Sequence, residues 1–268
     1  RGWISIGKYV YILETGERIY TSFKGKFDGN NKVVNKLTIN RFKENGIGLF
    51  GCVDNAEIKN IGLINVDITS DGASFSTGGL VGQSLNSQII NCFVSGYIRG
   101  GLSVGGLVGG NDNGSITNCY TLGQVRGDSP VGGLVGYLYE STISYSYSAC
   151  WVNGRDYAGG LVGIDSEKSK IVNSVAANPS VSGSGMTPNR IVGGSGYPSE
   201  REKNNYANAD MQINYFAMDA DINQNYNGID KSLTELQSAD FYINPSNWEG
   251  DKAWDLQSSH NDSKLWNI

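Results

Sequence analysis

One pentapeptide, Gly-Gly-Leu-Val-Gly, occurs four times in this sequence, and its copies begin at residues 78, 105, 132 and 159. Each copy therefore follows the one before it by 27 residues. A motif that returns at one fixed interval is typical of a chain built from stacked copies of a single unit, each of which contacts only its neighbours. The repeat constrains the fold strongly and says little by itself about function.

Each repeat unit contains three short runs with β-strand character, at residues 79–83, 88–95 and 97–99 in the first perfect copy. Gly, Ser and Asn separate these runs, and none is long enough or rich enough in helix formers to predict a helix. We therefore predict an all-β chain, folded as a parallel β-helix or solenoid of about seven coils of ~27 residues. The general preference of parallel crossover connections favours the right-handed form.

Two kinds of column follow from this repeat, because equivalent residues of successive coils lie above one another. The leucine of the pentapeptide forms an apolar column that we expect to point into the core: Leu80, Leu107, Leu134 and Leu161. An asparagine column, interrupted by Tyr145, consists of Asn60, Asn91, Asn118 and Asn173. We predict a structural ladder of side-chain amides at a corner of the coil, with ligand binding as the alternative.

The cysteines do not resemble a disulfide framework. Cys92 and Cys119 are 27 residues apart and share a column, where stacked cysteines usually act as small apolar core residues. A disulfide between these two remains an alternative. The sequence has no Cys-x-x-Cys pair and one histidine, so it predicts no metal site built from cysteine or histidine and no cofactor.

The glycine repeat divides the chain into three regions, which we predict to be an N-terminal cap over 1–24, the β-helix over 25–208 and a C-terminal capping region over 209–268. Caps are expected because the uncovered strand edges of a β-helix invite aggregation. Ser232 and Glu235 have the spacing of a capping box, which predicts a short helix over 232–242. Trp248 and Trp254 would then help to seal the last coil.

An aromatic column is the first candidate binding site. Phe93, Tyr120 and Tyr147 are each 27 residues apart and directly follow the cysteine column, so strand alternation places them on the opposite, outer face. Three rings stacked at ~4.8 Å would offer a platform to a sugar or a protein partner. The alternative is a structural ladder that is partly covered and stabilises the neighbouring strands.

A weaker candidate is a calcium site in the C-terminal region, where oxygen-bearing side chains alternate along the chain. These residues are Asp219, Asp221, Asn223, Asn225 and Asp230. The glycine that such loops use for their sharp turn is replaced by Gln224, and an aspartate stands where a bidentate glutamate is usual. A solvated polar loop is therefore the favoured interpretation of this segment.

Several classes of function are disfavoured by the sequence. The net charge is −5 and no basic cluster is present, which argues against a nucleic-acid partner. No apolar run approaches the ~18 to 20 residues of a membrane span. The acidic residues of the coils share no column, and Arg99 and Arg126 form one that ends at Asn153, so no catalytic arrangement is evident. The chain begins at Arg1 without a methionine, which suggests that any secretion signal was removed or not included and that the chain is part of a longer one.

These features resemble the GLUG-motif repeat family. The resemblance rests on the four pentapeptides, on the Asn-Cys-aromatic triplets at 91–93 and 118–120, and on flanking segments such as Gly2–Gly7 and Trp254–Leu256. It implies secreted or surface-anchored bacterial proteins, many of them labelled as candidate adhesins, and carries no catalytic motif. We expect a non-enzymatic adhesin that binds a glycan or a host or microbial protein. The alternatives are a structural spacer, or the accessory module of a polysaccharide-active enzyme or surface peptidase.

Overall fold

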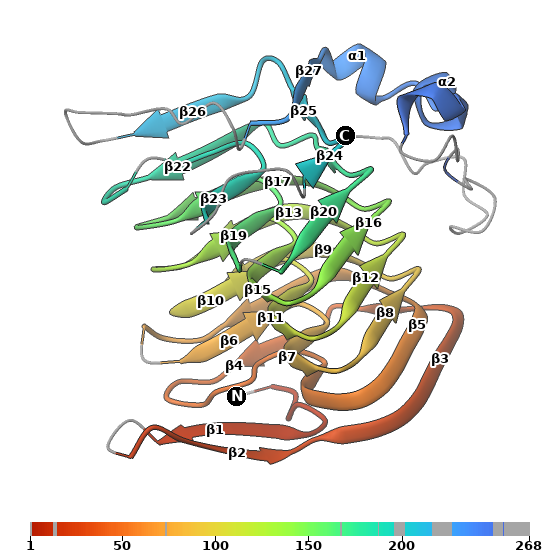
Figure 1. Cartoon of the computed structure of the whole chain (residues 1–268). Helices are drawn as coiled ribbons and strands as arrows, with labels where there is room; N and C mark the ends of the chain where they lie inside the picture. The colour runs from red at the N-terminus through yellow and green to blue at the C-terminus, as the bar shows by residue number, and fades with distance from the viewer. Residues whose placement is uncertain are drawn as a thin grey trace.

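The fold is a parallel β-solenoid, seen in a computed structural model in which the strands stack along one axis (Figure 1). The structure describes residues 2–12, 15–72, 74–166, 168–186, 188–195, 202–215, 227–248 and 254. Its strands form a 21-stranded sheet that winds around the core, a separate 4-stranded sheet and a 2-stranded hairpin. The predicted all-β parallel solenoid is therefore confirmed.

A whole coil consists of four short strands. The coil that follows the first perfect pentapeptide has β7 (Val81–Leu85), β8 (Gln88–Ile90), β9 (Phe93–Arg99) and β10 (Leu102–Gly105). The next has β11 (Val108–Asp112), β12 (Ser115–Thr117), β13 (Tyr120–Arg126) and β14 (Val131–Gly132). The third has β15 (Val135–Tyr139), β16 (Thr142–Ser144), β17 (Tyr147–Gly154) and β18 (Ala158–Gly159).

Less regular coils flank these three. On the N-terminal side lie β3 (Phe23–Asn35), β4 (Thr38–Asn40), β5 (Phe50–Thr69) and β6 (Phe75–Gly78). On the C-terminal side lie β19 (Val162–Asp165), β20 (Lys170–Val172), β21 (Val175–Ala176) and β22 (Ser180–Gly183). The last coil has β23 (Val192–Ser195), β24 (Glu202–Lys203), β25 (Tyr206–Asn208) and β26 (Gln212–Tyr215), and β27 (Ile229–Lys231) pairs with β25.

The structure corrects two details of the sequence prediction. Each regular coil has four strands rather than three, because Leu102–Gly105 and its equivalents form the 4-stranded sheet β6-β10-β14-β18 instead of a turn. Val104 of this strand is fully buried, which explains why the segment is a strand. The solenoid also has about six turns rather than seven.

The columns read from the sequence form the core. Successive coils pair in register at the repeat spacing, as in the parallel pairing of Ile116 with both Ile89 and Ile143. The four leucines of the pentapeptides are fully buried, at 0% exposure each. All four cysteines are buried free thiols, so the Cys92–Cys119 disulfide that the sequence left open is not formed.

The glycines of the pentapeptide are required because two backbones approach closely at this side of the tube. A Cβ atom on Gly105 would lie 2.7 Å from the amide nitrogen of Gly136 and 2.8 Å from the carbonyl oxygen of Leu134. One on Gly109 would lie 2.5 Å from the amide nitrogen of Thr77. Real Cβ atoms do not come so near to backbone. The motif that identifies the repeat is therefore a packing requirement of neighbouring coils.

The asparagine column lies at a corner where the backbone is left-handed. Asn60, Asn91 and Asn118 have φ angles of 55°, 53° and 55°, a region that asparagine tolerates better than most residues. The amide of Asn118 donates to Oδ1 of Asn91 at 2.6 Å, and that of Asn91 donates to Oδ1 of Asn60 at 3.1 Å. Tyr145 and Asn173 adopt the same conformation, with φ of 49° and 53°. The tyrosine that interrupts the column therefore leaves the corner intact.

Different structures lie at the two ends of the solenoid (Figure 1). The hairpin of β1 (Lys8–Ile12) and β2 (Glu17–Thr21) lies at the N-terminal end, where Gly2 and Ile6 form bridges with Ile39 and Phe50. The C-terminal region contains α1 (Leu233–Leu236), α2 (Ala239–Ile243) and a 3-10 turn over Pro245–Asn247. The capping box of Ser232 and Glu235 is present, but the helix predicted over 232–242 is two helices, because the first ends at Gln237 and Ser238 begins the second.

Candidate ligand-binding groove

The predicted aromatic column is stacked as expected but is not an open platform. The rings of Phe93 and Tyr120 are parallel at 4.8 Å between centroids, and those of Tyr120 and Tyr147 at 4.9 Å. Phe93 is 8% exposed and Tyr147 only 3%, while Tyr120 is half-buried. Burial also raises the pKa of the Tyr147 phenol well above its usual value. The exposed strip that the sequence predicted is therefore wrong for two of its three members.

The C-terminal region covers the Tyr147 end of this column. Trp254 packs on Tyr147 at 6.5 Å between ring centroids and on Tyr242 at 4.8 Å. Farther along the same column, Tyr206 contacts Phe241 edge-on and donates its hydroxyl to the carbonyl of Asn247 at 2.7 Å. These aromatics form a second apolar cluster on the outer face of the coils. The C-terminal aromatics therefore pack along the side of the solenoid, whereas the sequence had suggested that they seal its last coil.

The calcium candidate lies mostly beyond the part of the chain that the structure describes. Asp219, Asp221, Asn223 and Asn225 fall outside the described residues. Asp230 is described, and its carboxylate forms an ion pair with Arg190 at 2.6 Å. Among the described residues, no group of three or more His, Cys, Asp or Glu side chains could hold a metal ion.

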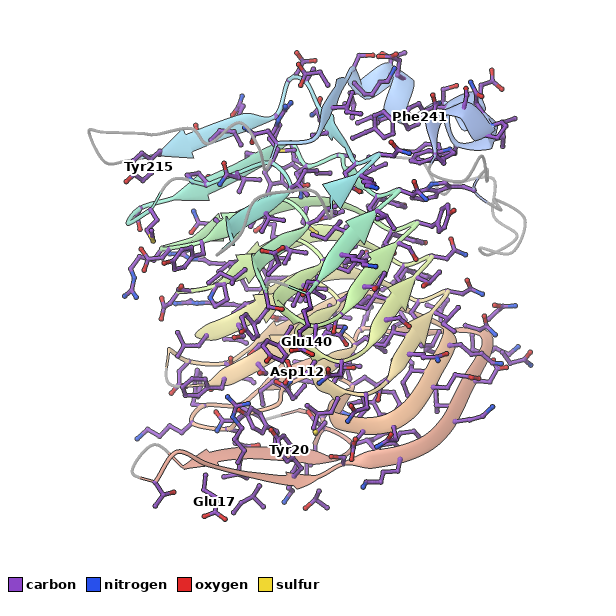
Figure 2. The ribbon with its side chains drawn as sticks, viewed as in Figure 1. Glu17, Tyr20, Asp112, Glu140, Tyr215 and Phe241 are labelled. Carbon is purple, nitrogen blue, oxygen red and sulfur yellow. The ribbon has the colours of Figure 1, made fainter. Side chains whose placement is uncertain are left out.

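A partly buried carboxylate lies on another face of the solenoid. Asp112 ends β11, and its Oδ2 accepts a hydrogen bond from the amide of Gln83 at 3.2 Å. Figure 2 shows Asp112 on the face formed by β7, β11 and β15, with Tyr20 of the hairpin toward the N-terminal end. Burial raises the pKa of the Asp112 carboxyl to about 6, while the charge of Arg18 opposes this shift. The hydrogen bond from Gln83 joins two neighbouring coils at this point, so we interpret the group as a feature of stability.

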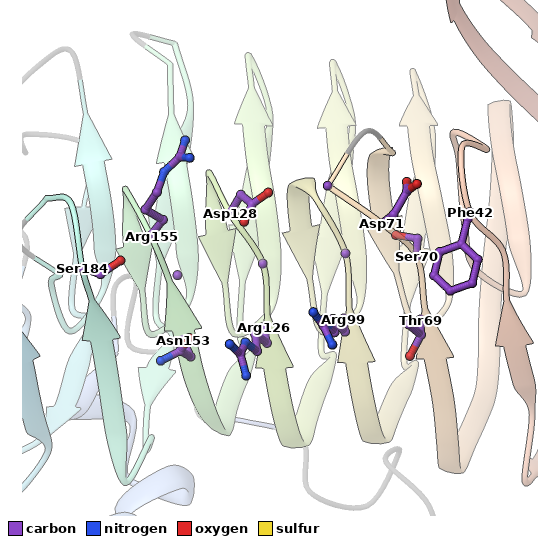
Figure 3. Close-up of a pocket in the computed structure, with 14 residues that line it drawn as sticks. Phe42, Thr69, Ser70, Asp71, Arg99, Arg126, Asp128, Asn153, Arg155 and Ser184 are labelled. Atoms are coloured by element: carbon purple, nitrogen blue, oxygen red, sulfur yellow. The ribbon is translucent and has the colours of Figure 1, made fainter.

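A groove of about 480 Å³ lies at the corner between the third and fourth strands of successive coils, and we call it the corner groove. Its volume is within the ~300 to 1,000 Å³ typical of small-ligand sites. One side carries residues from the ends of β5, β9, β13 and β17, and the other side comes from the turns that follow these strands (Figure 3). The first side is formed by Thr69, Arg99, Arg126 and Asn153, and the second by Asp71, Asp128 and Arg155.

An arginine pair is the main chemical feature of the corner groove. Arg99 and Arg126 are direct partners in the parallel pairing of β9 with β13, and both side chains are exposed. Adjacent strands are ~4.8 Å apart, and like charges directly opposite each other are destabilising. Neither guanidinium forms a hydrogen bond or ion pair with any other described residue. Two fixed positive charges with all their donors available therefore point to an anionic group as ligand.

The opposite side of the groove carries acceptors. Asp71 accepts hydrogen bonds from the hydroxyl of Ser74 at 2.8 Å and from the backbone nitrogen of Lys43 at 3.1 Å. The Asp128 carboxylate reaches back toward the preceding coil, since its Oδ2 lies 3.0 Å from where a Cβ of Gly72 would be. Arg155 is neutralised by an ion pair with Asp156 at 2.9 Å. Donors on one side and carboxylate acceptors on the other suit a ligand with both acidic groups and hydroxyl groups.

Sequence reasoning identified part of this groove. The column of Arg99, Arg126 and Asn153 was visible from the repeat spacing, but it was considered only for catalysis. Asp71 and Asp128 were not linked to it, although each lies two residues after a member of this strand column, because Gly101 takes the equivalent position in the coil between them. The feature that could have indicated this binding site is a column of positive charges on an outer strand face, with no opposite charge at the equivalent position of the neighbouring coils.

The described fold defines the class of protein as a β-solenoid of short glycine-marked repeats. Sequence comparison assigns the repeat itself, since the family described as "The GLUG motif" matches residues 73–98 and 100–126. This match assigns these two repeats to the GLUG motif, in agreement with the resemblance seen in the sequence. No curated protein matches the sequence significantly.

One solved structure supports the fold. It is the crystal structure of a protein described as a putative immunoglobulin A1 protease from Bacteroides ovatus, which is 20% identical in sequence with a TM-score of 0.57. The match covers 79% of this chain and 70% of the other. At this identity the likeness concerns the fold alone. No helix among the described residues is long and apolar enough to cross a membrane.

Proposed function

We propose that this chain is a non-enzymatic, secreted or surface-exposed bacterial protein that acts as an adhesin and binds its ligand in the corner groove. The observation that carries the proposal is the pair of arginines, Arg99 and Arg126, which lie in register with no ionic partner among the described residues. A spacer has no use for two adjacent like charges, which cost stability when nothing neutralises them. A ligand with anionic groups would neutralise both.

Binding rather than catalysis is supported by the state of the groove's side chains. A guanidinium offers five hydrogen-bond donors and no acceptor, so the two arginines are suited to holding an anion. Asp71 accepts hydrogen bonds from Ser74 and from the backbone of Lys43, so part of its acceptor capacity is already used within the fold. These features favour a site that holds a ligand without changing it.

One observation favours a polysaccharide-active enzyme as the second candidate. Asp71 and Asp128 lie on the same side of the groove, and glycoside hydrolysis uses two carboxyl groups that flank the scissile bond. This candidate predicts that the chain releases new reducing ends from a polysaccharide, and that Asp71→Asn and Asp128→Asn each abolish the release. Our proposal predicts binding without release.

The test is an array of glycans and extracellular matrix proteins, probed with the chain and with an Arg99→Gln/Arg126→Gln variant. Lys32→Gln/Lys170→Gln is the matched control, because it removes two exposed positive charges from other parts of the solenoid. Circular dichroism would establish that all three proteins are folded. We expect specific binding that the arginine variant loses and the lysine variant keeps.

The other outcomes of this test are equally clear. Binding that survives the loss of both arginines would contradict the corner groove as the site. If the unmodified chain binds nothing, the adhesin proposal is contradicted and the spacer is supported. Release of reducing ends by the unmodified chain would support the enzyme instead.

A further inference from the structure

An exposed aromatic side chain lies beside the corner groove. Trp151 is 53% exposed on β17, two residues before Asn153 of the groove. Val152 between them is 1% exposed, so Trp151 and Asn153 point to the same outer face. Trp248 and Trp254, by contrast, are buried in the aromatic cluster of the C-terminal region. Tryptophan is enriched where proteins contact partners, so an exposed indole beside a groove is a candidate contact for the ligand of that groove.

The strand register places Trp151 next to the arginine pair. Trp151 pairs with Gln124 of β13, and Gln124 pairs with the half-buried Tyr97 of β9. Two positions farther on the same face, Asn153 pairs with Arg126, and Arg126 with Arg99. Residues diagonal to each other on neighbouring strands are ~7 to 8 Å apart, within reach of long and aromatic side chains. The outer face therefore carries a row with aromatic rings beside a row with positive charges.

This combination has a defined chemical complement. An aromatic ring packs against the apolar face of a sugar ring, and the arginine fork binds a carboxylate or sulfate with two parallel hydrogen bonds. The carboxylates of Asp71 and Asp128 can accept hydrogen bonds from sugar hydroxyls. Coils repeat at ~4.8 Å, which is close to the length of one sugar residue in an extended polysaccharide. Each arginine could then bind the acidic group of one sugar residue.

We infer that the ligand of the corner groove is an acidic polysaccharide that lies along the solenoid axis. One sugar ring of this polysaccharide packs on Trp151, and acidic groups of the polysaccharide bind Arg99 and Arg126. This inference rests on the proposed function and narrows its ligand to one class. Single-stranded nucleic acid also offers anions and rings, but its backbone phosphates would lie near the carboxylates of Asp71 and Asp128. A neutral glycan would leave both arginines unpaired.

The test is titration calorimetry of the chain with polygalacturonate, chondroitin sulfate, neutral dextran and single-stranded DNA, at low salt and at 0.5 M salt. The variants are Arg99→Gln/Arg126→Gln and Trp151→Ala. Tyr139→Ala is the matched control for the tryptophan, because Tyr139 is an exposed aromatic residue, at 39%, on a different strand face. Circular dichroism would show whether each variant keeps the fold.

We expect an acidic polysaccharide to bind and dextran and DNA not to bind. Each of the two variants should weaken binding by about tenfold or more, in line with the usual weight of arginine and tryptophan in binding sites. Tyr139→Ala should leave it unchanged, and high salt should weaken it by screening the exposed charges.

The outcomes separate this inference from the proposed function. If binding depends on the arginines but not on Trp151, or if dextran or DNA binds as tightly as the acidic polysaccharides, the inference is overturned and the groove remains the site. The same holds if the groove binds a protein from the array and no acidic polysaccharide. If the binding of no ligand changes when the arginines are replaced, both this inference and the proposed function are overturned.

Discussion

Replacing Gly132 by alanine should destabilise the solenoid much more than a glycine-to-alanine change usually does. Gly132 begins the third pentapeptide and ends β14, so it belongs to the 4-stranded sheet. An added Cβ would lie 2.7 Å from the amide nitrogen of Gly163 and 2.8 Å from the carbonyl oxygen of Leu161. Both atoms are backbone of the next coil, so neither can move aside as a side chain would.

The size of the effect follows from what has to shift. Comfortable contacts of carbon are ~3.5 to 4.0 Å, so the two coils must separate by several tenths of an ångström. Beside this point the coils are joined by hydrogen bonds from Leu134 to Leu161 at 2.9 Å and from Gly133 to Gly159 at 3.1 Å. Overpacking costs about 1 to 3 kcal/mol and each weakened hydrogen bond about 1 kcal/mol. We expect Gly132→Ala to lower the free energy of unfolding by about 2 to 5 kcal/mol.

The assay is urea unfolding followed by circular dichroism, with Gly72→Ala as the matched control. A Cβ on Gly72 would meet only Oδ2 of Asp128, at 3.0 Å, which is the far end of a half-buried side chain. The control should therefore change the free energy of unfolding by about 0.5 kcal/mol or less. If Gly132→Ala unfolds at the same urea concentration as the control, close approach of the coils is not the reason for the repeated glycine.

Two further changes test other parts of the structure. Burial raises the pKa of the Asp112 carboxyl from 3.8 to about 6, so the folded state binds this proton more tightly than the unfolded state, and the free energy of unfolding falls as pH rises between these values. At pH 7, Asp112→Asn should therefore be more stable than the unmodified chain by about 1 to 2 kcal/mol. Near pH 4 the two proteins should be equally stable, as measured by urea unfolding. Equal stability at pH 7 would show that the carboxyl is well solvated. Asn118→Ala should lower the free energy of unfolding by about 2 to 3 kcal/mol, because it loses both the hydrogen bond to Asn91 and a residue suited to φ of 55°. Asn118→Gly, which keeps the backbone freedom, should cost only about 1 kcal/mol in thermal unfolding, and an equal loss for the two variants would contradict the role of the backbone.

The repeat made the interior of this protein predictable from its sequence. Leu80 and Leu107 are buried because equal residues at equal spacing must lie above one another, and a mixed column would leave cavities. The asparagine ladder followed in the same way, from side chains that suit a left-handed corner. Even Tyr145, which interrupts that column, adopts the same backbone conformation, because the pairing of the coils on either side fixes it.

What the sequence did not predict involves segments outside the repeat. Phe93 and Tyr147 do point outward, but packing by Trp254 and its neighbours, which follow no period, removes Tyr147 from water. Phe93 is covered by the backbone of the preceding coil, where Gly62 leaves room for its ring. The two carboxylates of the corner groove belong to coils that are not adjacent, and Gly101 takes the equivalent position between them, so they form no continuous acidic column in the sequence. Such contacts depend on tertiary packing, and a repeat pattern carries no information about them.

The same regularity provides an internal control for function. Arg126 and Asn153 occupy equivalent positions of adjacent coils with the same backbone pairing, so the fold accepts either side chain there. Trp151 likewise stands between Gln124 and Ser180 in its column, and all three positions are strand. Folding therefore gives no reason for two adjacent arginines or for an exposed tryptophan, whereas it fully accounts for Leu107 and Asn118. In a repeat protein, neighbouring coils show which outer side chains the fold does not require. Those side chains are the ones to test for binding.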